Sequence, residues 1–333
     1  MKRTFIILLL FLSNIINAQV SDFKGIDFTQ ADNIAKLNRG HSLKNLPILA
    51  HRLTHNLKTD VEKFRAIYVW VCNNITGDSS VESKVIRKRN KFKNDSMGFM
   101  AWNNLYQKTA FKKLLKQKRT LCTGYAYLIK ELSFLVNIDC VIVDGYGRAV
   151  ESNMDTLEMA NHSWNAVKLN NKWYLCDATW SSGYFLNHAF IKDYNDGYFL
   201  TVPVLFAKNH FPLDKKWLLT DRINETEFIT SPIVYGKTFE HQIIPKYPNN
   251  LNVHVKKNQK TSFRFKSLKK IPLKNISLVQ YIGSEEHILK IHNLKNENGT
   301  ISFNYNFKHK GLHDVHIKIA NDIIASYTFN VTK

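Results

Sequence analysis

Two stretches of the chain, "TLCTGYAYLIKEL" (residues 120–132) and "NHSWNAVKLNNKWYLCDATW" (residues 161–180), carry most of the information about the fold. The first has apolar residues at helical spacing and little charge, which predicts a buried helix beginning beside Cys122. In the second, apolar residues recur with a period of two, and the pair Asn170-Asn171 separates two such runs. This pattern predicts two antiparallel strands joined by a two-residue turn.

The register of this hairpin brings a histidine and an aspartate to one face of the sheet. With a two-residue turn at 170–171, Trp164 faces Asp177 across the hairpin. His162 lies two residues from Trp164 and therefore points to the same side. His162 and Asp177 are then diagonal neighbours whose side chains can meet. A loop with an odd number of residues would place them on opposite faces.

Cys122 stands at the expected N-terminus of its helix, where unpaired N–H groups and the helix dipole stabilise a thiolate. Lys118 and Arg119, just before it, add positive charge, and Gly124 in the first turn would let a substrate backbone approach. With His162 as base and an aspartate to orient it, the set fits nucleophilic catalysis. Taken singly, each residue is explained as well by a structural role, because a cysteine before an apolar helix often acts as a small hydrophobe.

The rest of the first two-thirds of the chain predicts helices first and strands later. Thr59 and Glu62 form a capping box at the start of a helix over 59–74. Another helix is expected over 104–117, with an apolar face made of Leu105, Ala110, Leu114 and Leu115. After the helix at Cys122, a strand is expected over 139–147, followed by the hairpin. Helices followed by antiparallel strands indicate an α+β domain.

From about residue 238 the pattern changes to short alternating strands separated by Asn, Gly, Lys and Pro. The expected strands are "NVHVKK", "TSFRFKS", "ISLVQYI", "HILKIH", "TISFNYNF", "HDVHIKI" and "ASYTFNV". Seven or eight strands in roughly 95 residues indicate an all-β, immunoglobulin-like sandwich. We therefore divide the chain into a signal peptide (1–18), an α+β domain (19–222), a linker (223–237) and a sandwich (238–333).

The net charge of +20 comes largely from two basic runs, residues 84–93 and 112–119. The first belongs to a polar segment, residues 75–95, that is expected to hold a loop and a short basic helix. Neither run belongs to a nucleic-acid-binding motif, so no nucleic acid is expected as a partner. Solvated faces are the favoured interpretation, and contact with an acidic surface or polymer is the alternative.

The first 18 residues have the three parts of a secretory signal peptide. Lys2 and Arg3 give a basic start, residues 5–16 an apolar run, and Ala18 a small residue at the cleavage position. The run of about 12 residues is shorter than the ~20 that span a bilayer. The expected location is therefore secreted or periplasmic, after cleavage near Ala18.

The four cysteines of an exported chain would allow two disulfides. However, Cys72, Cys140 and Cys176 lie in apolar contexts, which buried free thiols explain equally well. No disulfide is assigned. No cysteine pair has the close spacing of a zinc site, and no acidic loop has calcium-ligand spacing. Neither a metal nor another cofactor is expected.

Three segments resemble the transglutaminase-like superfamily of papain-like cysteine enzymes, and more narrowly its kyphoscoliosis-peptidase-like branch. They are "CTGYAYLIKELSFLVNIDCVIVDGYG", "HSWNAVKLNNKWYLCDATW" and "YFLTVPVLFAKNHFPLDKKWLL". The resemblance covers about residues 45–222 and implies that the α+β domain, residues 19–222, is a transglutaminase-like domain with a papain-like core. It also implies that Cys122 is the nucleophile, His162 the base and Asp177 the acid that orients the base.

Other residues of this region are expected to line a cleft. The backbone N–H of Cys122 is the expected first oxyanion donor, and Trp102 and Gln107 lie upstream, where a second donor often occurs. Packing explains both equally well. The full set of expected cleft-lining residues is Trp102, Gln107, Gly124, Tyr125, Trp164 and Trp180. His210, in "HFP", is expected to be structural.

The resemblance implies acyl chemistry, in which a thiolate attacks an amide carbonyl and forms a thioester acyl-enzyme. Release to water would make the protein a cysteine peptidase or amide hydrolase, with a peptide or protein, including a cell-wall peptide, as substrate. Release to an amine would make it a protein-glutamine acyltransferase with the same three residues. A catalytically silent binding or scaffold module is the third alternative.

Overall fold

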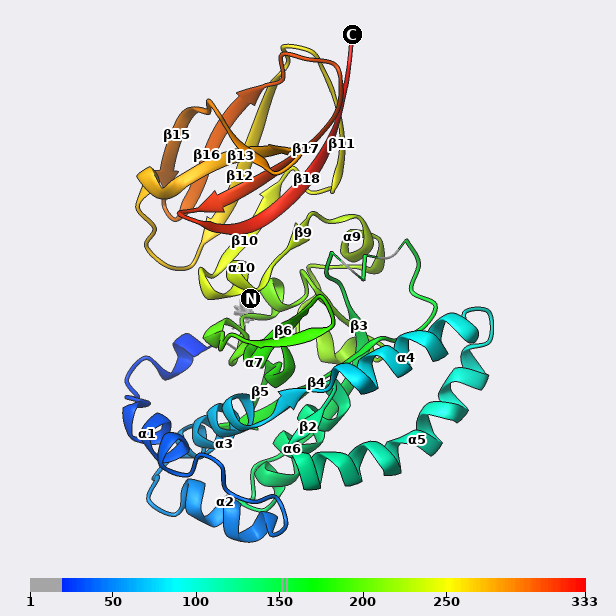
Figure 1. Ribbon diagram of the computed structural model, residues 1–333. Coiled ribbons are helices and arrows are strands. Elements are labelled where there is room, and N and C mark those ends of the chain that lie inside the picture. The colour runs from blue at the N-terminus through cyan, green and yellow to red at the C-terminus, as the bar shows by residue number, and fades with distance from the viewer. Residues whose placement is uncertain (1–19, 151, 154) are drawn as a thin grey trace, which may run out of the picture.

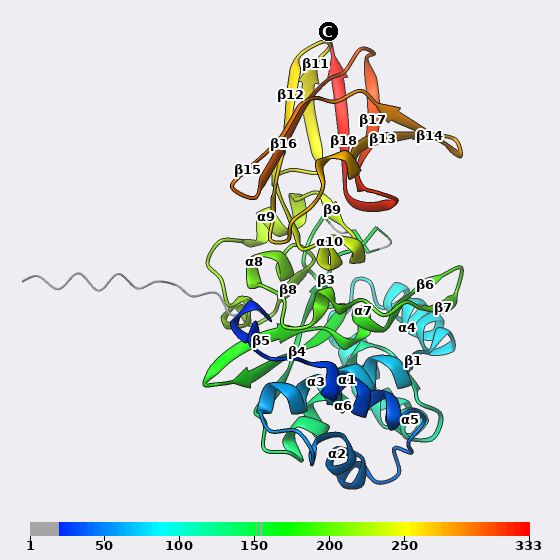
Figure 2. The same ribbon diagram turned by 90° about the vertical axis from the view of Figure 1, so that its left-hand side faces the viewer.

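The computed structural model describes residues 20–150, 152–153 and 155–333 and shows an α+β domain packed against a β-sandwich (Figures 1 and 2). The expected signal peptide, residues 1–18, lies outside the described residues. Within the described part of the chain, no helix is both long and apolar enough to cross a membrane.

Helices dominate the first half of the α+β domain. They are the 3₁₀ turn η1 (Val20–Phe23), α1 (Thr29–Leu37), α2 (Leu46–Thr54), α3 (Asp60–Asn74), α4 (Ser79–Lys91), α5 (Ser96–Gln117) and α6 (Cys122–Phe134). The capping box predicted for α3 is confirmed, because the Thr59 hydroxyl accepts the Glu62 N–H and the Glu62 carboxylate accepts the Thr59 N–H. Helix α3 is buried along most of its length and packs against α6.

Helix α5 is longer than predicted, and the residues that it buries differ from the predicted ones. It begins at Ser96, upstream of the expected start at residue 104. The Asp95 carboxylate accepts the Gly98 N–H and caps the helix at this earlier position. The sequence placed Leu105 and Leu115 on a buried face, but these side chains are 79% and 39% exposed. Only Phe99 and Leu114 of this helix are buried.

A four-stranded antiparallel sheet forms the other half of the domain. Its strands are β3 (Cys140–Gly147), β4 (His162–Leu169), β5 (Lys172–Cys176) and β8 (His210–Pro212), in the order β5-β4-β3-β8. Asn170 and Asn171 both have positive φ, as the tight turn requires, and Leu169 pairs with Lys172. The predicted register is therefore confirmed. Helix α6 packs across β3 and β4.

Short elements connect these parts. They are β1 (Thr76–Gly77), which pairs with β2 (Arg119–Thr120), α7 (Ala178–Ser182), the hairpin β6 (Gly183–Leu186) and β7 (Ala189–Lys192), η2 (Asp196–Tyr198), α8 (Pro203–Phe206) and η3 (Lys215–Leu218). All four cysteines are free thiols; Cys72, Cys140 and Cys176 are buried, whereas Cys122 is half-buried.

The C-terminal part is an immunoglobulin-like sandwich of two sheets. One contains β10 (Ile243–Tyr247), β12 (Lys260–Ser267), β16 (Thr300–Asn306) and β15 (His292–Glu297). The other contains β11 (Asn252–Lys256), β18 (Asp322–Thr332), β17 (Gly311–Ile319), β13 (Ile276–Ile282) and β14 (Glu285–Leu289), and the turn η4 (Leu273–Asn275) precedes β13. Between them lies an apolar core built around Phe263, Phe265, Phe303 and Phe329.

Two expectations about this half differ from the structure. "HILKIH" is not one strand, because β14 ends at Leu289, β15 begins at His292, and the two belong to different sheets. Residues 223–237, expected as a linker, are folded into α9 (Glu225–Thr230), β9 (Ile233–Val234) and the start of α10 (Gly236–Glu240). Since β9 pairs with β18, this segment ties the two halves together.

Candidate active site

Cys122 is the first residue of α6, so its side chain lies at the helix N-terminus. The N-cap, Leu121, provides no side-chain hydrogen bond to the first turn. The positive end of the helix dipole therefore acts on the thiol without a competing capping group. The His162 side chain and the Ser163 N–H lie close to the Cys122 thiol, and both act to lower its pKa.

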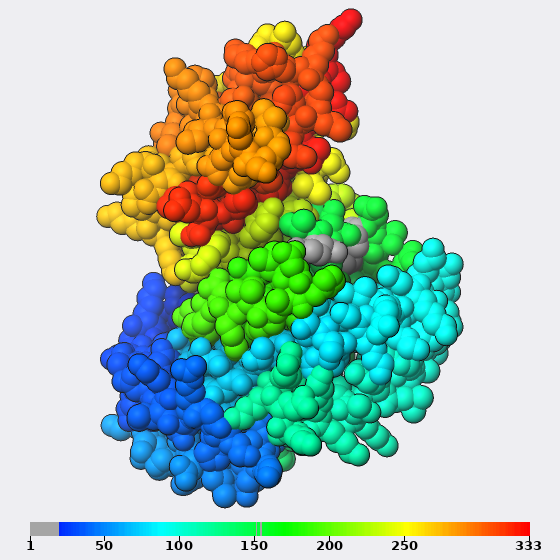
Figure 3. All heavy atoms as spheres, viewed as in Figure 1, coloured from blue at the N-terminus to red at the C-terminus, as the bar shows by residue number. Residues whose placement is uncertain are grey.

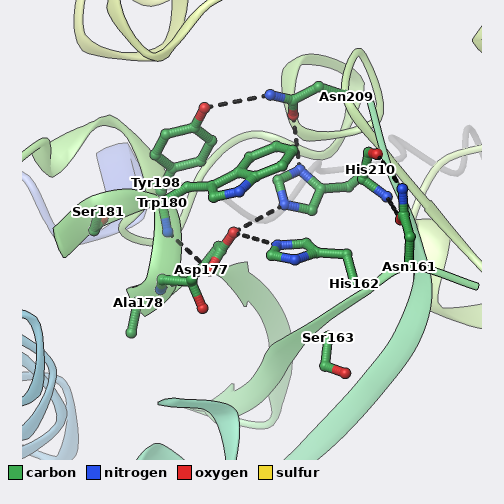
Figure 4. A network of polar contacts seen from close by, with 12 residues as sticks. Asn161, His162, Ser163, Asp177, Ala178, Trp180, Ser181, Tyr198, Asn209 and His210 are labelled. Atoms are coloured by element: carbon green, nitrogen blue, oxygen red, sulfur yellow. Dashed lines mark hydrogen bonds and ion pairs between the residues drawn. The ribbon is translucent and has the colours of Figure 1, made fainter. Parts of the chain in front are cut away.

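His162 and Asp177 meet as the hairpin register predicted. His162 opens β4, and Asp177 directly follows β5 and caps α7 (Figure 4). One carboxylate oxygen of Asp177, Oδ1, accepts the N–H groups of Thr179 at 2.7 Å and Trp180 at 3.3 Å. The other, Oδ2, accepts from Nε2 of His162 at 2.8 Å. Nδ1 is then the ring nitrogen left for the Cys122 sulfur.

These contacts shift the three pKa values in the directions that favour a thiolate–imidazolium pair. Burial alone would raise the pKa of Cys122, but the hydrogen bond and charge of His162 hold it below its usual value. Burial would lower the pKa of His162, yet the charge and hydrogen bond of Asp177 raise it. Asp177 has its pKa held well below the usual range, because the two histidines outweigh the effect of burial.

A second histidine contacts the same carboxylate. Nε2 of His210 lies 3.1 Å from Asp177 Oδ2, and the side chain of His210 is fully buried (Figure 4). The strand β8 brings it there, because β3 pairs with β4 on one side and with β8 on the other, where Gly147 faces His210. The expectation that His210 only has a packing role was therefore incomplete. His210 helps to hold Asp177 in place.

The protonation of His210 follows from its surroundings. Burial lowers its pKa to about 4, so the ring is neutral near pH 7. Its one proton stays on Nε2, facing the Asp177 carboxylate, because that is its only charged acceptor. Its Nδ1 lies 2.7 Å from Oδ1 of Asn209, and the amide nitrogen of Asn209 donates to the Tyr198 hydroxyl at 3.3 Å. With the His210 proton on Nε2, exchanging the amide oxygen and nitrogen of Asn209 would turn an N–H toward Nδ1.

Aromatic and glycine residues fix the ring of His162. Trp180 stacks on it with ring centroids 4.6 Å apart and an interplanar angle of 20°. Gly147 lies against both rings, since a Cβ there would come within 3.0 Å of His162 and of Trp180. Glycine at this position thus permits the close approach of the strand to the site.

The structure brings only some of the expected cleft-lining residues to the site. Trp180 contacts His162 directly, and Trp164 is buried at an edge-on contact with His210. Gly124 faces Thr120 rather than open space, because an added Cβ would lie 1.9 Å from the Thr120 hydroxyl. Its small size therefore serves packing, which corrects the expectation that it admits a substrate.

The remaining three residues lie elsewhere. Tyr125 is in the core, where its hydroxyl accepts a hydrogen bond from Ser182. Trp102 stacks on Tyr106 of its own helix α5, at 5.2 Å between centroids. Gln107 also lies on α5 and is half-buried. None of the contacts of these three residues joins them to Cys122 or His162 in the described part of the chain.

Arg89 is a site neighbour that sequence reasoning missed. It lies on α4, packs over the Phe99 ring, and donates to the backbone carbonyls of Met159 and Ala160, just before His162. Burial lowers its pKa, and the charge of Cys122 opposes that shift. Its place in the basic run 84–93 was visible in the sequence, but nothing there separated it from its exposed neighbours.

His162, Asp177 and His210 also have the composition of a metal site. Each offers one ligand atom, and these atoms all lie within 4.8 Å of one another. Both Nε2 atoms lie at hydrogen-bond distance from the same oxygen, Asp177 Oδ2. Hydrogen bonds between the two rings and the carboxylate therefore account for this cluster.

Comparison with known proteins identifies the kind of domain that carries this site. A family model described as the transglutaminase-like superfamily matches residues 48–178. Human kyphoscoliosis peptidase is 33% identical over 175 residues, which cover 51% of this chain and 24% of that protein. Hillarin from Drosophila melanogaster is 24% identical over 234 residues, covering 65% of this chain and 26% of hillarin.

The chain spans about a quarter of the length of these curated relatives. Among solved structures, the Lin-41 filamin domain aligns with 27% of the chain and 89% of its own, at 11% identity and a TM-score of 0.21, and adds nothing to the topology described above. Residues 48–178 therefore form a transglutaminase-like domain, and the chain is similar to the kyphoscoliosis peptidases of human and mouse.

Proposed function

We propose that the protein is a cysteine peptidase or amide hydrolase in which Cys122 is the nucleophile, His162 the general base and acid, and Asp177 the group that orients His162. The observation that carries this proposal is the position of Cys122 at the N-terminus of α6 close to His162, whose ring is hydrogen-bonded to Asp177 at 2.8 Å. The name of the human relative, kyphoscoliosis peptidase, supports hydrolysis of a peptide bond.

The proposed reaction begins with attack of the Cys122 thiolate on the carbonyl carbon of an amide. The N–H of Cys122, at the N-terminus of α6, is placed to stabilise the oxyanion. The His162 imidazolium donates its proton to the amine nitrogen as the C–N bond breaks, leaving a thioester on the sulfur. Neutral His162 then takes a proton from water, and the resulting attack on the thioester releases the acid and regenerates the thiolate.

His210 supports this sequence from behind Asp177. The Asp177 carboxylate accepts hydrogen bonds from two imidazoles. These bonds restrict the rotation of its side chain and keep its negative charge beside His162. The imidazolium form of His162 is thereby favoured in the resting thiolate–imidazolium pair and again once His162 has taken a proton from water. His210 is a positioning residue in this proposal, since it touches neither the sulfur nor the substrate carbonyl.

The proposed setting is outside the cytoplasm, on the strength of the signal-peptide pattern in residues 1–18 alone. The proposed substrate class is a peptide or protein, cell-wall peptides included. Fractionation of cells expressing the full chain tests the location. Recovery of uncleaved protein in the cytoplasm would contradict it.

Incubation of the purified protein with a mixed peptide library tests the activity, with Cys122→Ala as the control and mass spectrometry as the readout. We expect new free carboxyl termini with the wild type only, and a trapped acyl mass on Cys122. Including a primary amine separates hydrolysis from transfer, because transfer would give amide products instead of acids. The absence of both product types and of acyl-Cys122 would overturn the proposal in favour of a binding module.

A further inference from the structure

Helices α4 and α5 form a hairpin, here called the basic arm (residues 79–117), at the edge of the α+β domain (Figure 1). In the space-filling view, this arm projects at the side of the molecule, away from the sandwich (Figure 3). Near the tip of the hairpin, Arg89 donates to the backbone carbonyls of Met159 and Ala160, which come just before His162 in the chain.

The charged residues of the arm are mostly positive. It carries ten Lys and Arg residues but only two acidic ones, Glu82 and Asp95, a net +8 out of the +20 of the whole chain. Helix α5 itself, 22 residues long, has no acidic residue. Such a density of like charge is unfavourable by itself and creates a positive potential that attracts polyanions.

Four of the ten cations connect α4 to α5 or the arm to the rest of the domain. Arg89 holds backbone carbonyls, Lys113 pairs with Asp78 at 2.5 Å, and Lys84 and Lys88 lie over aromatic rings of α5. Of the others, Arg87 donates to the Ser83 carbonyl and Lys91 lies over the Phe92 ring. All six of the others are exposed and form no ion pair within the described residues: Arg87, Lys91, Lys93, Lys108, Lys112 and Lys116. These six charges are available to a partner.

Large apolar side chains are exposed among these charges. Met97 is 74%, Met100 55% and Leu105 79% exposed, all on the half of α5 next to the tip of the hairpin. At 100° per residue, Met97, Leu105, Lys108 and Lys112 fall on one outward side of the helix. Apolar and cationic side chains therefore share one surface instead of separating into a buried and a solvated face.

We propose that the basic arm docks on an anionic phospholipid surface, with Met97, Met100 and Leu105 inserted at the headgroup level and the six free cations on lipid phosphates. The charge sets the sign of the partner, since each Lys or Arg near an anionic surface adds attraction. The exposed apolar groups select a lipid interface, because a soluble polyanion offers them nothing to bury against. Long lysine side chains can reach the phosphates while their neighbours insert.

Vesicle co-sedimentation of the full chain at low salt tests this docking. The vesicles contain phosphatidylglycerol and phosphatidylcholine in equal parts, or phosphatidylcholine alone. We expect binding to the first only, reduced by at least about 100-fold in the triple variant K108E/K112E/K116E. The variant M97Q/M100Q/L105Q should bind at least about tenfold more weakly, because it lacks the inserted groups.

Two matched controls use the far domain. Leu312→Gln removes an equally exposed apolar group, 72% exposed, and K308E/K310E reverses charges outside the arm. Both should bind vesicles as the wild type does, and all variants should keep the wild-type melting temperature. Absence of binding to phosphatidylglycerol vesicles would overturn the proposal. So would undiminished binding by M97Q/M100Q/L105Q, which would show a charge-only site for a polyanion.

Discussion

The interior around Asp177 and the core of the sandwich are both fully buried, yet they differ in kind. The sandwich core consists of aromatic and aliphatic side chains such as Phe263 and Val315, and stacked rings fill the space between the sheets. The interior around Asp177 holds its carboxylate and two imidazoles, each of which lies within hydrogen-bond distance of that carboxylate. Burying such groups costs free energy unless each is paired.

This contrast separates residues that maintain the fold from those that prepare chemistry. In the sandwich, stability grows with the apolar area removed from water. Around Asp177, the low dielectric strengthens each charge contact and keeps Cys122 and His162 away from their ordinary pKa values. Substitutions in the sandwich core should therefore change only the stability of the fold. Substitutions around Asp177 should change the reactivity of Cys122.

The largest expected effect is that of Cys122→Ser. Replacing the sulfur removes the nucleophile, and turnover of any peptide substrate should fall by at least about 10³-fold. The melting temperature should change little, because Cys122 is half-buried at a helix end and serine fits the same space. Steady-state kinetics and thermal denaturation together check this. Retained turnover would break the assignment of this region to chemistry.

Phe263→Ala makes the converse comparison. Phe263 is completely buried and stacks on Phe303 at 4.9 Å, so its removal should lower the free energy of unfolding by about 3–5 kcal/mol. Alkylation of Cys122 in the folded variant should proceed at the wild-type rate. Urea denaturation gives the stability, and the exposed Leu312→Ala is the control, expected within about 0.5 kcal/mol of wild type.

A smaller effect is expected for His210→Gln. Loss of the second imidazole frees Asp177 to rotate and weakens its support of His162, which should slow Cys122 alkylation at neutral pH roughly tenfold. His241→Gln is a matched control, because His241 also contacts a carboxylate, that of Asp322, at 2.8 Å, and has no hydrogen bond, ion pair or ring contact with His162 or Asp177 in the described part of the chain. Equal alkylation rates in wild type and His210→Gln would reduce His210 to a packing residue.

The parts of the fold set by local rules could be predicted from the sequence. The Asn170-Asn171 turn fixes the hairpin register, and that register alone brings His162 to Asp177. The capping box at Thr59 and the helix beginning at Cys122 were likewise visible, because capping and apolar periodicity act over a few residues.

The features that could not be predicted from the sequence depend on which distant strands pair with each other. His210 lies 33 residues after Asp177 and reaches it only because β8 pairs with β3, a contact between strands distant in the chain. A three-residue strand such as β8 has no measurable periodicity. The true start of α5 was missed for a related reason, since its first two turns present exposed Met97 and Met100 instead of a buried apolar face.

The rate of Cys122 alkylation as a function of pH, in wild type and in His162→Ala, tests the central claim most directly. His162 has its pKa raised and Cys122 has its pKa lowered, so the reactive thiolate–imidazolium pair should be populated from below the ordinary thiol pKa of about 8.5 up to the pKa of His162, about 10. We expect rapid labelling already near pH 7 in the wild type. In His162→Ala, burial alone should act on the thiol and move labelling above pH 8.5. Identical profiles centred at the ordinary thiol pKa in both proteins would contradict the account.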